Sequence, residues 1–375
     1  MQEIKEVQRL RDWINNSFAF PYKLVLLVTF KCNLDCLYCN DAEDRKSSKY
    51  DDSDELTDAE WMDIVNQGIE MNVRDWFIPG LGEPFMRSKL IVNIFKKIKN
   101  KTSDSVFNLS TNGSLFTDKV IKESVKNGID WIHISLDSPD RKTHDFLRGK
   151  KGTYNRILWA LKRYMYWKQL FKTEKPRLSF DTVLTSKNYK QLIPLAELGS
   201  QYGIDYVCFN PLRIASGNIN KVKQHNLRLN AKQKKEVYNY ILSFNKKKYK
   251  IPLIFNGFSD LEMGMVSSSA EGFKKKKYIS HNFKEAFLHS PCYEPWLAMI
   301  INFKGDVNYC TSCGFWDMAE NIKDKSLINI WSGKPFYYVR SSILKHQPMK
   351  TCFGCGIIRI RKDIKSQVKN YFKNG

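Results

Sequence analysis

Residues 23–40 read KLVLLVTFKCNLDCLYCN, and this stretch decides the fold. Its first part, KLVLLVTF, is mostly apolar and rich in leucine and valine, which predicts a buried strand. Directly after it, Cys32, Cys36 and Cys39 follow a C-x-x-x-C-x-x-C spacing in a chain with only nine cysteines. The sequence therefore predicts a strand whose carboxyl end opens into a loop that carries three thiols.

Strand-like segments alternate with helix-like segments along residues 23–215. After the first strand, the further strand candidates are residues 75–80, 105–113, 131–137, 177–185 and 206–212. This alternation is typical of parallel sheets with right-handed crossovers. We expect an α/β fold, a partial (β/α)6 TIM-like barrel that binds its ligand at the carboxyl ends of the strands.

The rest of the chain divides by composition. Five of the nine cysteines fall between residues 292 and 355, a segment too short to build a large core without metal. We therefore expect four parts: an N-terminal helical extension (1–20), the barrel (21–215), a lysine-rich helical connector (216–290) and a small C-terminal iron-sulfur domain (291–375).

Composition and the first residues indicate the cellular compartment to expect. The sequence has no run near the ~20 apolar residues that a membrane span needs. Its first residues, MQEIKEVQRLRDWINNSF, lack the apolar centre and cleavage site of a secretory signal. We expect a cytoplasmic protein, in which clustered thiols stay reduced and indicate metal or catalysis more often than disulfides.

The chain is strongly basic, with 61 basic and 39 acidic residues and a net charge of +22. Most of the excess is lysine on helix-like surfaces, without the pattern of a known nucleic-acid-binding fold. We interpret it as a solvated surface, with an anionic substrate or surface as the alternative, and do not expect nucleic-acid binding.

Three thiolates on one short loop can face a common point, and thiolates are the preferred ligands of iron-sulfur clusters. A structural zinc site would need a fourth protein ligand, and the sequence offers none close to this loop. A 4Fe-4S cluster held by three cysteines leaves one iron open for a substrate or cofactor.

The loop resembles that of the radical S-adenosylmethionine (radical SAM) superfamily, and Tyr38 before the third cysteine also matches. The resemblance implies a 4Fe-4S cluster and S-adenosyl-L-methionine bound to its open iron. It also implies reductive cleavage of that cofactor to a 5'-deoxyadenosyl radical, which abstracts a substrate hydrogen. A flavodoxin- or ferredoxin-type reductant would supply the electron.

A second segment, PGLGEPF (79–85), resembles the glycine-glutamate-proline segment of the superfamily, which meets the amino group of the cofactor. Gly80 and Gly82 allow a turn with close backbone approach, and Glu83 offers an acceptor for an ammonium group. With Pro84, these residues are expected to bind S-adenosylmethionine.

Two later segments extend the resemblance. LSTNGSLFT (109–117) implies cofactor contacts from Ser110 and Asn112. SLDSPDRKTHDFLRGKKGTY (135–154) implies that Ser135 and Arg148 touch the methionine carboxylate or the ribose, and an arginine fork suits a carboxylate. This segment departs from the family pattern at Ser138, where glycine is usual, and by one extra residue before HDFLRG.

The later cysteines resemble the SPASM/twitch extension, in which a cysteine, a G-x-x-x-x-C hairpin and a later pair hold an auxiliary 4Fe-4S cluster. The match selects Cys292, Cys310, Cys352 and Cys355 as ligands and leaves Cys313 as an alternative ligand. A full SPASM domain has seven cysteines, so five fit the shorter twitch form better. Zinc is the rival interpretation of the two C-x-x-C pairs. Four thiolates leave no open iron, so we expect an electron relay.

Three residues are candidates for contact with substrate. In YVCFNPLR (206–213), strand alternation places Cys208 towards the barrel interior if Val207 and Phe209 face the helices. Cys208 could donate a hydrogen atom to a substrate radical, or be a small core residue. His133 and Asp181 are candidate bases on neighbouring strands, or structural polar residues.

We interpret the sequence as an enzyme that oxidises or epimerises a small metabolite or sugar-like substrate, possibly anionic. The first alternative is a maturase of a ribosomal peptide or protein. Such enzymes often carry a peptide-binding module of ~80 residues before the barrel, whereas only ~20 precede the first strand here. The second alternative is a non-catalytic basic metalloprotein that binds nucleic acid.

Overall fold

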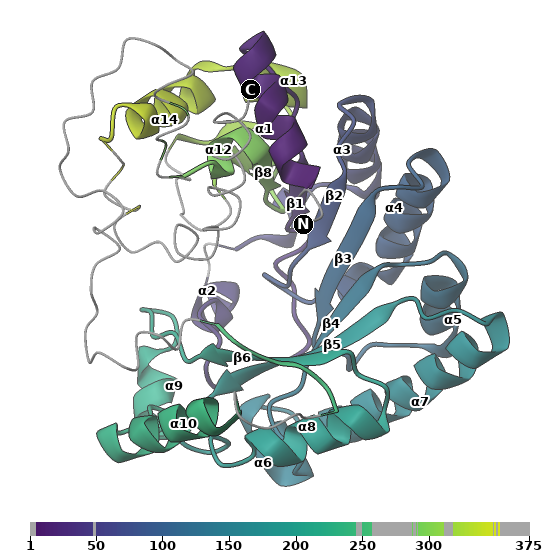
Figure 1. Cartoon of the computed structure of the whole chain (residues 1–375), viewed down its shortest axis with the longest axis vertical. Helices are drawn as coiled ribbons and strands as arrows, with labels where there is room; N and C mark the ends of the chain where they lie inside the picture. The colour runs from purple at the N-terminus through teal and green to yellow at the C-terminus, as the bar shows by residue number, and fades with distance from the viewer. Residues whose placement is uncertain are drawn as a thin grey trace.

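The structure is a computed structural model. It describes residues 5–47, 50–244, 250–256, 287, 290, 292–310, 318–347, 349 and 352. Figure 1 shows a curved sheet with helices along its outer face. No described helix combines the length and apolar character needed to cross a membrane.

The sheet has ten strands in the order β10-β9-β8-β1-β2-β3-β4-β5-β6-β7. The strands are β1 (Lys23–Leu26), β2 (Asp75–Ile78), β3 (Val106–Thr111), β4 (Trp131–Ser135), β5 (Arg177–Leu184), β6 (Tyr206–Pro211), β7 (Leu253–Phe255), β8 (Ala298–Ile301), β9 (Asp306–Asn308) and β10 (Glu320–Asn321). From β8 through β1 to β7 the neighbours are parallel, and β9 and β10 are antiparallel. In the described residues β7 and β10 end the sheet unpaired, so the barrel is open.

The predicted α/β fold with six parallel strands is confirmed, and the structure adds β7 and β8 at its two flanks. The crossover helices are α3 (Asp58–Glu70), α4 (Ser88–Lys101), α5 (Asp118–Lys126), α6 (Arg141–Leu147), α7 (Thr153–Phe171) and α8 (Leu192–Gln201). The remaining helices are α1 (Lys5–Asn16), α2 (Ala42–Lys46), α9 (Ile219–Gln224), α10 (Ala231–Phe244), α12 (Glu294–Leu297), α13 (Leu327–Trp331) and α14 (Lys334–Leu344), with 3-10 turns η1 (Asp52–Asp54) and η2 (Pro84–Arg87).

Local sequence signals fix where the helices begin. Thr57 caps α3 through a capping box with Glu60, in which each side chain bonds the other residue's backbone N–H. Thr117 and Asp140 cap α5 and α6 by accepting from backbone N–H groups of the first turn. These caps fix the start of each helix, so that a loop separates it from the carboxyl end of the preceding strand.

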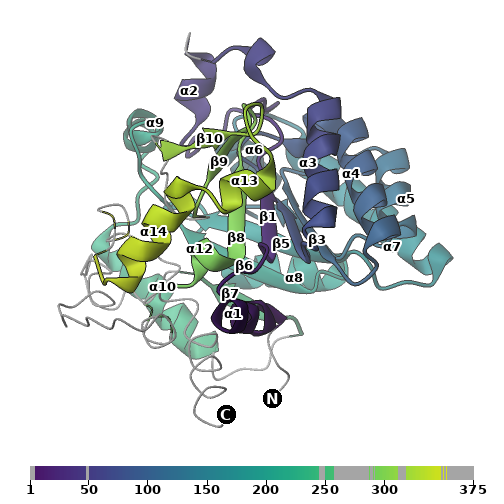
Figure 2. The ribbon, with the colours of Figure 1, turned by 90° about the horizontal axis from the view of Figure 1, so that it is seen from above.

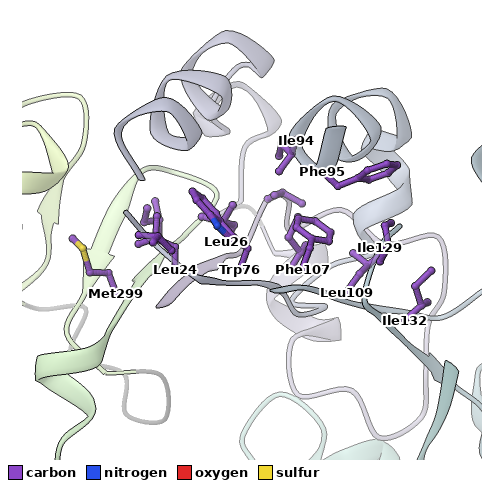
Figure 3. Close-up of a cluster of buried hydrophobic side chains, with 14 of the residues drawn as sticks. Leu24, Leu26, Trp76, Ile94, Phe95, Phe107, Leu109, Ile129, Ile132 and Met299 are labelled. Carbon is purple, nitrogen blue, oxygen red and sulfur yellow. The ribbon is translucent and has the colours of Figure 1, made fainter. Parts of the chain in front are cut away.

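Every second strand residue packs against the helices. Figure 3 shows Leu24, Trp76, Phe107 and Ile132 from successive strands on the side of α4, which contributes Ile94. Burying one such side chain contributes about 1.5–3 kcal/mol to stability. The alternate residues of β2, β3 and β4 are only half-buried, because they face the barrel interior.

The C-terminal segment shares this core. β8 pairs with β1 over four residues of register, beginning at Lys23 and Ala298. Trp13 of α1 donates its indole N–H to the carbonyl of Trp296 (2.9 Å), and Trp331 donates to the carbonyl of Ala19 (2.7 Å). Figure 1 shows α1 beside α12 and α13, and Figure 2 shows α12 and α14 on the other side of β1 from α3, α4 and α5. The first and last parts of the described chain therefore hold each other in place.

Candidate metal centre and strand-end site

The three-cysteine loop follows β1 at the carboxyl edge of the sheet. Cys36 is buried, and Cys32 and Cys39 are half-buried. Burial raises the pKa of Cys36 to about 12, with the nearby charge of Arg148 acting in the opposite direction and the other two thiols acting in the same direction. The three thiols are thus close enough to influence one another's ionisation.

In the part of the chain that the structure describes, no three His, Cys, Asp or Glu side chains form a group that could hold one metal ion. Ligands of a polynuclear cluster bind different irons and therefore lie farther apart. A cluster on this loop therefore does not require the three thiols to meet at one point.

Three glycines from three different segments press against the backbone of this loop. A Cβ on Gly82 would lie 2.3 Å from the Lys31 carbonyl oxygen, and one on Gly149 would lie 2.2 Å from that of Asp35. A Cβ on Gly217 would lie 1.9 Å from the carbonyl oxygen of Asn40. We call Gly82, Gly149 and Gly217 the glycine clamp. No side chain fits at these positions unless the cysteine loop moves.

Polar side chains complete the support of the loop. Asn218, which is fully buried, donates to the carbonyl of Tyr38 (2.8 Å) and to the side chain of Asn40 (2.6 Å). Asn112 donates to the side-chain oxygen of Asn33 (2.9 Å). The loop is therefore held at its start and its end by side chains from distant segments.

The predicted cofactor residue Glu83 lies buried below the loop. Its carboxylate accepts from the Thr111 hydroxyl (2.7 Å) and from the backbone N–H of Asn112 (2.7 Å) and Phe85 (3.1 Å). Burial raises its pKa, and these donors oppose the rise. Each carboxylate oxygen can accept two hydrogen bonds, and Oε2 accepts one from the described residues. Glu83 could therefore still accept from an ammonium group, and this contact stays a prediction. The neighbouring Pro84 is buried at the start of η2, and Gly80 lies in the turn before it.

Arg148 is paired inside the protein. Its Nε lies 2.8 Å from Asp137 Oδ2, the same oxygen that accepts from the Tyr38 hydroxyl at 2.6 Å. The guanidinium also lies 5.5 Å from the centre of the Tyr38 ring. Burial opposes the charge, but Asp137, Tyr38 and Cys36 together outweigh it and raise the pKa of Arg148. The predicted contact of Arg148 with a cofactor carboxylate is untested. Asp137, to which the sequence analysis gave no role, ties Arg148 to the loop.

The interior of the barrel carries two layers of polar residues. Strand register places Ser110, His133, Ser179 and Tyr206 side by side in the lower layer, and Ser135, Asp181 and Cys208 in the upper layer, nearer the cysteine loop. Most of these side chains are only half-buried, which leaves the interior accessible.

His133 is the centre of the lower layer. Its Nδ1 lies 2.8 Å from the Ser179 hydroxyl and 3.2 Å from the Tyr206 hydroxyl, and its ring stacks on Trp131. Burial lowers its pKa to about 4, so the imidazole is neutral at pH 7. His133 thus has protein partners and forms a floor beneath the upper layer together with its aromatic neighbours.

Asp181 and Cys208 lie next to each other in the upper layer. Burial raises the pKa of Asp181 to about 6, and its carboxylate has no hydrogen-bond partner in the described part of the chain. Cys208 accepts from the side-chain amide of Asn256 (3.0 Å), and burial raises the pKa of its thiol to about 12. As expected, Val207 and Phe209 pack into the core while Cys208 points to the interior. The sequence analysis missed Asn256, because the three-residue strand before it is too short to give a periodic signal.

Comparison with known families decides the identity of this site. The radical SAM superfamily profile matches residues 26–165, and the SPASM iron-sulfur cluster-binding domain matches residues 292–356. The chain contains a radical SAM domain and a SPASM domain. These domains imply S-adenosylmethionine and a 4Fe-4S cluster for the first and an auxiliary iron-sulfur cluster for the second. The three grouped thiols, with arginines beside them, fit an anionic cluster.

Several radical SAM proteins are similar to parts of the chain. GTP 3',8-cyclase of Desulforamulus reducens is 36% identical over 37% of this chain and 41% of its own length. Mycofactocin maturase MftC of Mycolicibacterium smegmatis is 26% identical over 54% of this chain and 48% of its own length. The chain therefore spans about half the length of the curated relatives that it matches.

Solved structures confirm the fold over most of the chain. Streptococcus suis SuiB bound to S-adenosylmethionine superposes with a TM-score of 0.64, at 18% identity, covering 96% of this chain and 79% of SuiB. The structure named native anSMEcpe with bound AdoMet gives a TM-score of 0.57 at 13% identity, covering 94% of this chain and 98% of that chain.

The radical SAM core is followed by the second cysteine set. Cys310 and Cys352 are buried in the main hydrophobic core, and Cys292 packs against it. Cys313 and Cys355 lie outside the described residues. The structure thus brings three of the four predicted auxiliary ligands to one core. The SPASM match supports an iron-sulfur cluster there, and the narrower twitch form stays a prediction.

Proposed function

We propose that this protein is a radical SAM maturase that modifies a peptide or protein substrate. This proposal reverses the order of the two enzymatic interpretations drawn from the sequence. The observation that carries it is that a maturase and a peptide cyclase are among the relatives. Mycofactocin maturase MftC and a PqqA peptide cyclase, of Granulibacter bethesdensis, match 54% and 49% of this chain at 26% and 25% identity.

The chain's own residues hold and orient the reacting groups. Cys32, Cys36 and Cys39 would hold the cluster, and the glycine clamp fixes their loop above the barrel interior. When bound, the cluster and S-adenosylmethionine supply the one-electron chemistry that removes a hydrogen atom from an unactivated C–H bond. The substrate side chain would enter the open interior and reach the upper polar layer.

Asp181 is placed to take the proton that a substrate radical loses when it is oxidised. Its carboxylate faces the interior beside Cys208, and its pKa of about 6 leaves it mostly ionised at pH 7. His133 is a poorer base, because its Nδ1 already contacts two hydroxyl groups in the lower layer. We propose Asp181 as the general base and His133 as part of the floor.

Oxidation or epimerisation of a small, sugar-like metabolite is the second candidate. The upper layer favours it, because Ser135, Asp181 and the amide side chains of Asn210 and Asn256 offer several hydrogen-bond partners to hydroxyl groups. In an epimerisation Cys208 would donate the hydrogen atom, and its neutral thiol is the form that can do so.

The test is anaerobic reconstitution with iron, sulfide, dithionite and S-adenosylmethionine. Candidate peptides encoded beside the gene are added, and their masses and the release of 5'-deoxyadenosine are measured. We expect a mass change in one peptide that is lost in Asp181→Asn. Absence of 5'-deoxyadenosine from a fully loaded protein contradicts radical SAM activity. Turnover of a hydroxylated metabolite, with all peptides unchanged, favours the second candidate.

A further inference from the structure

Arg45 makes a direct contact with one of the three loop thiols. Helix α2 begins three residues after Cys39 and turns the side chain of Arg45 back over the loop. Its Nη2 donates to Cys39 Sγ at 2.9 Å. A donor that carries a full positive charge stabilises negative charge on the sulfur more strongly than a neutral donor does.

The guanidinium is fixed from outside its own short helix. Its Nη1 donates to the carbonyl of Leu81 (3.1 Å), and its central carbon lies 5.5 Å from the centre of the Phe30 ring. Leu81 belongs to the turn after β2 and Phe30 to the segment after β1. Arg45 is therefore held against Cys39 by two separate segments and does not sample the solvent freely.

The two arginines beside the loop differ in their carboxylate partners. In the described residues Arg45 forms no salt bridge with a carboxylate, although Asp41 lies near enough to act on it electrostatically. Arg148, the second arginine beside the loop, is different because Asp137 pairs with it at 2.8 Å. Of these two arginines, only Arg148 therefore has a carboxylate partner in the described residues.

We propose that Arg45 is a positioning residue that sets the reduction potential of the cluster held by Cys32, Cys36 and Cys39. The inference depends on the proposed function only in requiring a cluster on this loop. Reduction adds one electron, taken from an external reductant, and makes the cluster more negative. A fixed positive charge at a ligand sulfur stabilises the reduced form more than the oxidised form and so raises the midpoint potential.

Removing the charge should therefore make the cluster harder to reduce. We expect Arg45→Gln to lower the ratio of reduced to oxidised cluster at a fixed potential about tenfold, which equals a fall of about 59 mV for one electron. Arg45→Met should do the same, while Arg45→Lys should keep most of the wild-type potential because it keeps the charge. Arg163→Gln, at a partly exposed ion pair with Asp118 between α7 and α5, is the matched control and should change nothing.

The experiment is a potentiometric titration of the full-length reconstituted protein, followed by electron paramagnetic resonance. The spectrum of a chain with Cys32, Cys36 and Cys39 replaced by alanine identifies the signal of the other cluster, which is subtracted. Neither substrate nor turnover is needed, so a failure to modify peptide does not affect the result. Iron and sulfide are measured on every variant.

A lower potential in the two neutral variants, with iron content unchanged and the lysine variant close to wild type, supports the proposal. Equal potentials in all loaded variants overturn it. Loss of cluster iron in all three variants also overturns it, because Arg45 would then serve only to build the loop. A wild-type protein that binds no cluster on this loop overturns both this inference and the proposed function.

Discussion

Gly149 and Gly128 have nearly the same positive φ, +67° and +66°, but their surroundings differ. A Cβ on Gly149 would meet the carbonyl of Asp35 at 2.2 Å, whereas one on Gly128 would meet nothing within 4 Å. The conformational cost of replacing either glycine is therefore similar, and only Gly149 adds a collision with the cysteine loop. Comparing the two variants therefore distinguishes the effect of backbone strain from the effect of displacing the cysteine loop.

We predict that Gly149→Ala destabilises the protein by more than about 2 kcal/mol and lowers the iron held by the first three cysteines. Gly128→Ala should cost about 1 kcal/mol, from its positive φ alone, and keep the iron. Chemical denaturation and iron analysis of both variants check this. Equal iron content in the two variants would contradict the role of the glycine clamp.

Asp181 gives a prediction about pH. Burial raises its folded-state pKa to about 6 from the model-compound value of 3.8, so the folded protein binds this proton more tightly than the unfolded chain. The ionised carboxylate therefore costs stability as the pH rises through 6, and this cost is absent below the unfolded pKa. The pKa shift corresponds to a loss of at most about 3 kcal/mol in the free energy of unfolding above pH 6, and solvent screening reduces this loss.

Asp181→Asn should thus be more stable than the wild type at pH 7–8 and similar to it near pH 4, while losing turnover. Urea denaturation across this range measures the difference. Asp130 is the matched control, because Lys99 and Lys175 both approach its carboxylate, and its pKa is lowered although burial opposes this. Asp130→Asn should be destabilising at pH 7. A wild type more stable than Asp181→Asn at every pH would contradict an ionised, unpartnered Asp181.

Among single residues, the sequence predicted the metal ligands better than the residues that hold the cysteine loop and the interior side chains in place. The spacing of Cys32, Cys36 and Cys39 is local, so it can be recognised along the chain. Gly217 and Asn256 act through contacts with residues far away in sequence, and neither stands in a pattern that indicates a partner. The interior position of Cys208 followed from strand alternation, because Val207 and Phe209 beside it are strongly apolar.

Helix α1 is the element whose contacts reach farthest along the chain. Trp13 donates a hydrogen bond to the Trp296 carbonyl of α12. The guanidinium carbon of Arg340 in α14 lies 4.6 Å from the centre of the Trp13 ring. The same guanidinium lies 4.2 Å from the ring of Trp331. Burial lowers the pKa of Arg340 to about 9. Arg340 therefore remains charged at pH 7 inside an aromatic cluster that joins both ends of the described chain.

We predict that Trp13→Ala destabilises the protein by about 3–5 kcal/mol, because it empties a buried site and removes the cation–π contact. Trp13→Phe should cost less, since it keeps most of the packing and loses the hydrogen bond to Trp296. Tyr337→Ala on α14, where the side chain is 72% exposed, is the control and should change stability by less than about 0.5 kcal/mol. Urea denaturation provides the measurement, and a Trp13→Ala change as small as the control's would show that α1 is dispensable.

Six strands were predictable because each lies in a segment with several residues of clear strand-like pattern, and the connector predicted to be helical contains α9 and α10. β7 and β8 were not predicted, because the division of the chain after residue 215 rested on composition and not on strand periodicity. Their partners were still harder to foresee. Alternation shows which face of a strand is buried, but not that residue 298 pairs beside residue 23.

At the scale of the whole molecule, the two cysteine sets differ in what surrounds them. Cys32, Cys36 and Cys39 lie on a loop at the edge of the sheet, supported by backbone contacts and polar ties. Cys310 and Cys352 are instead part of the main hydrophobic core, which also contains Trp13 and Trp331. The boundaries drawn from composition stay a prediction, but the shared sheet and core mean that the C-terminal segment is not packed as an isolated unit in the described structure.

The last prediction follows from this difference. Replacing Cys32, Cys36 and Cys39 by alanine should remove about four irons and leave about four on the second cysteine set. The free energy of unfolding should change by less than about 2 kcal/mol, because only a loop at the edge of the sheet loses its ligand. Replacing Cys310 and Cys352 by alanine should remove the other irons and destabilise the whole protein by more than about 3 kcal/mol, since metal ligation and core packing are lost together. Iron, sulfide and zinc analysis with chemical denaturation tests both arms, and Cys208→Ala, outside both sets, is the control for a buried thiol that binds no metal. Zinc in place of iron in the first variant would contradict an auxiliary iron-sulfur cluster. Equal destabilisation by the two sets would show that the edge loop is as deeply coupled to the fold as the C-terminal core.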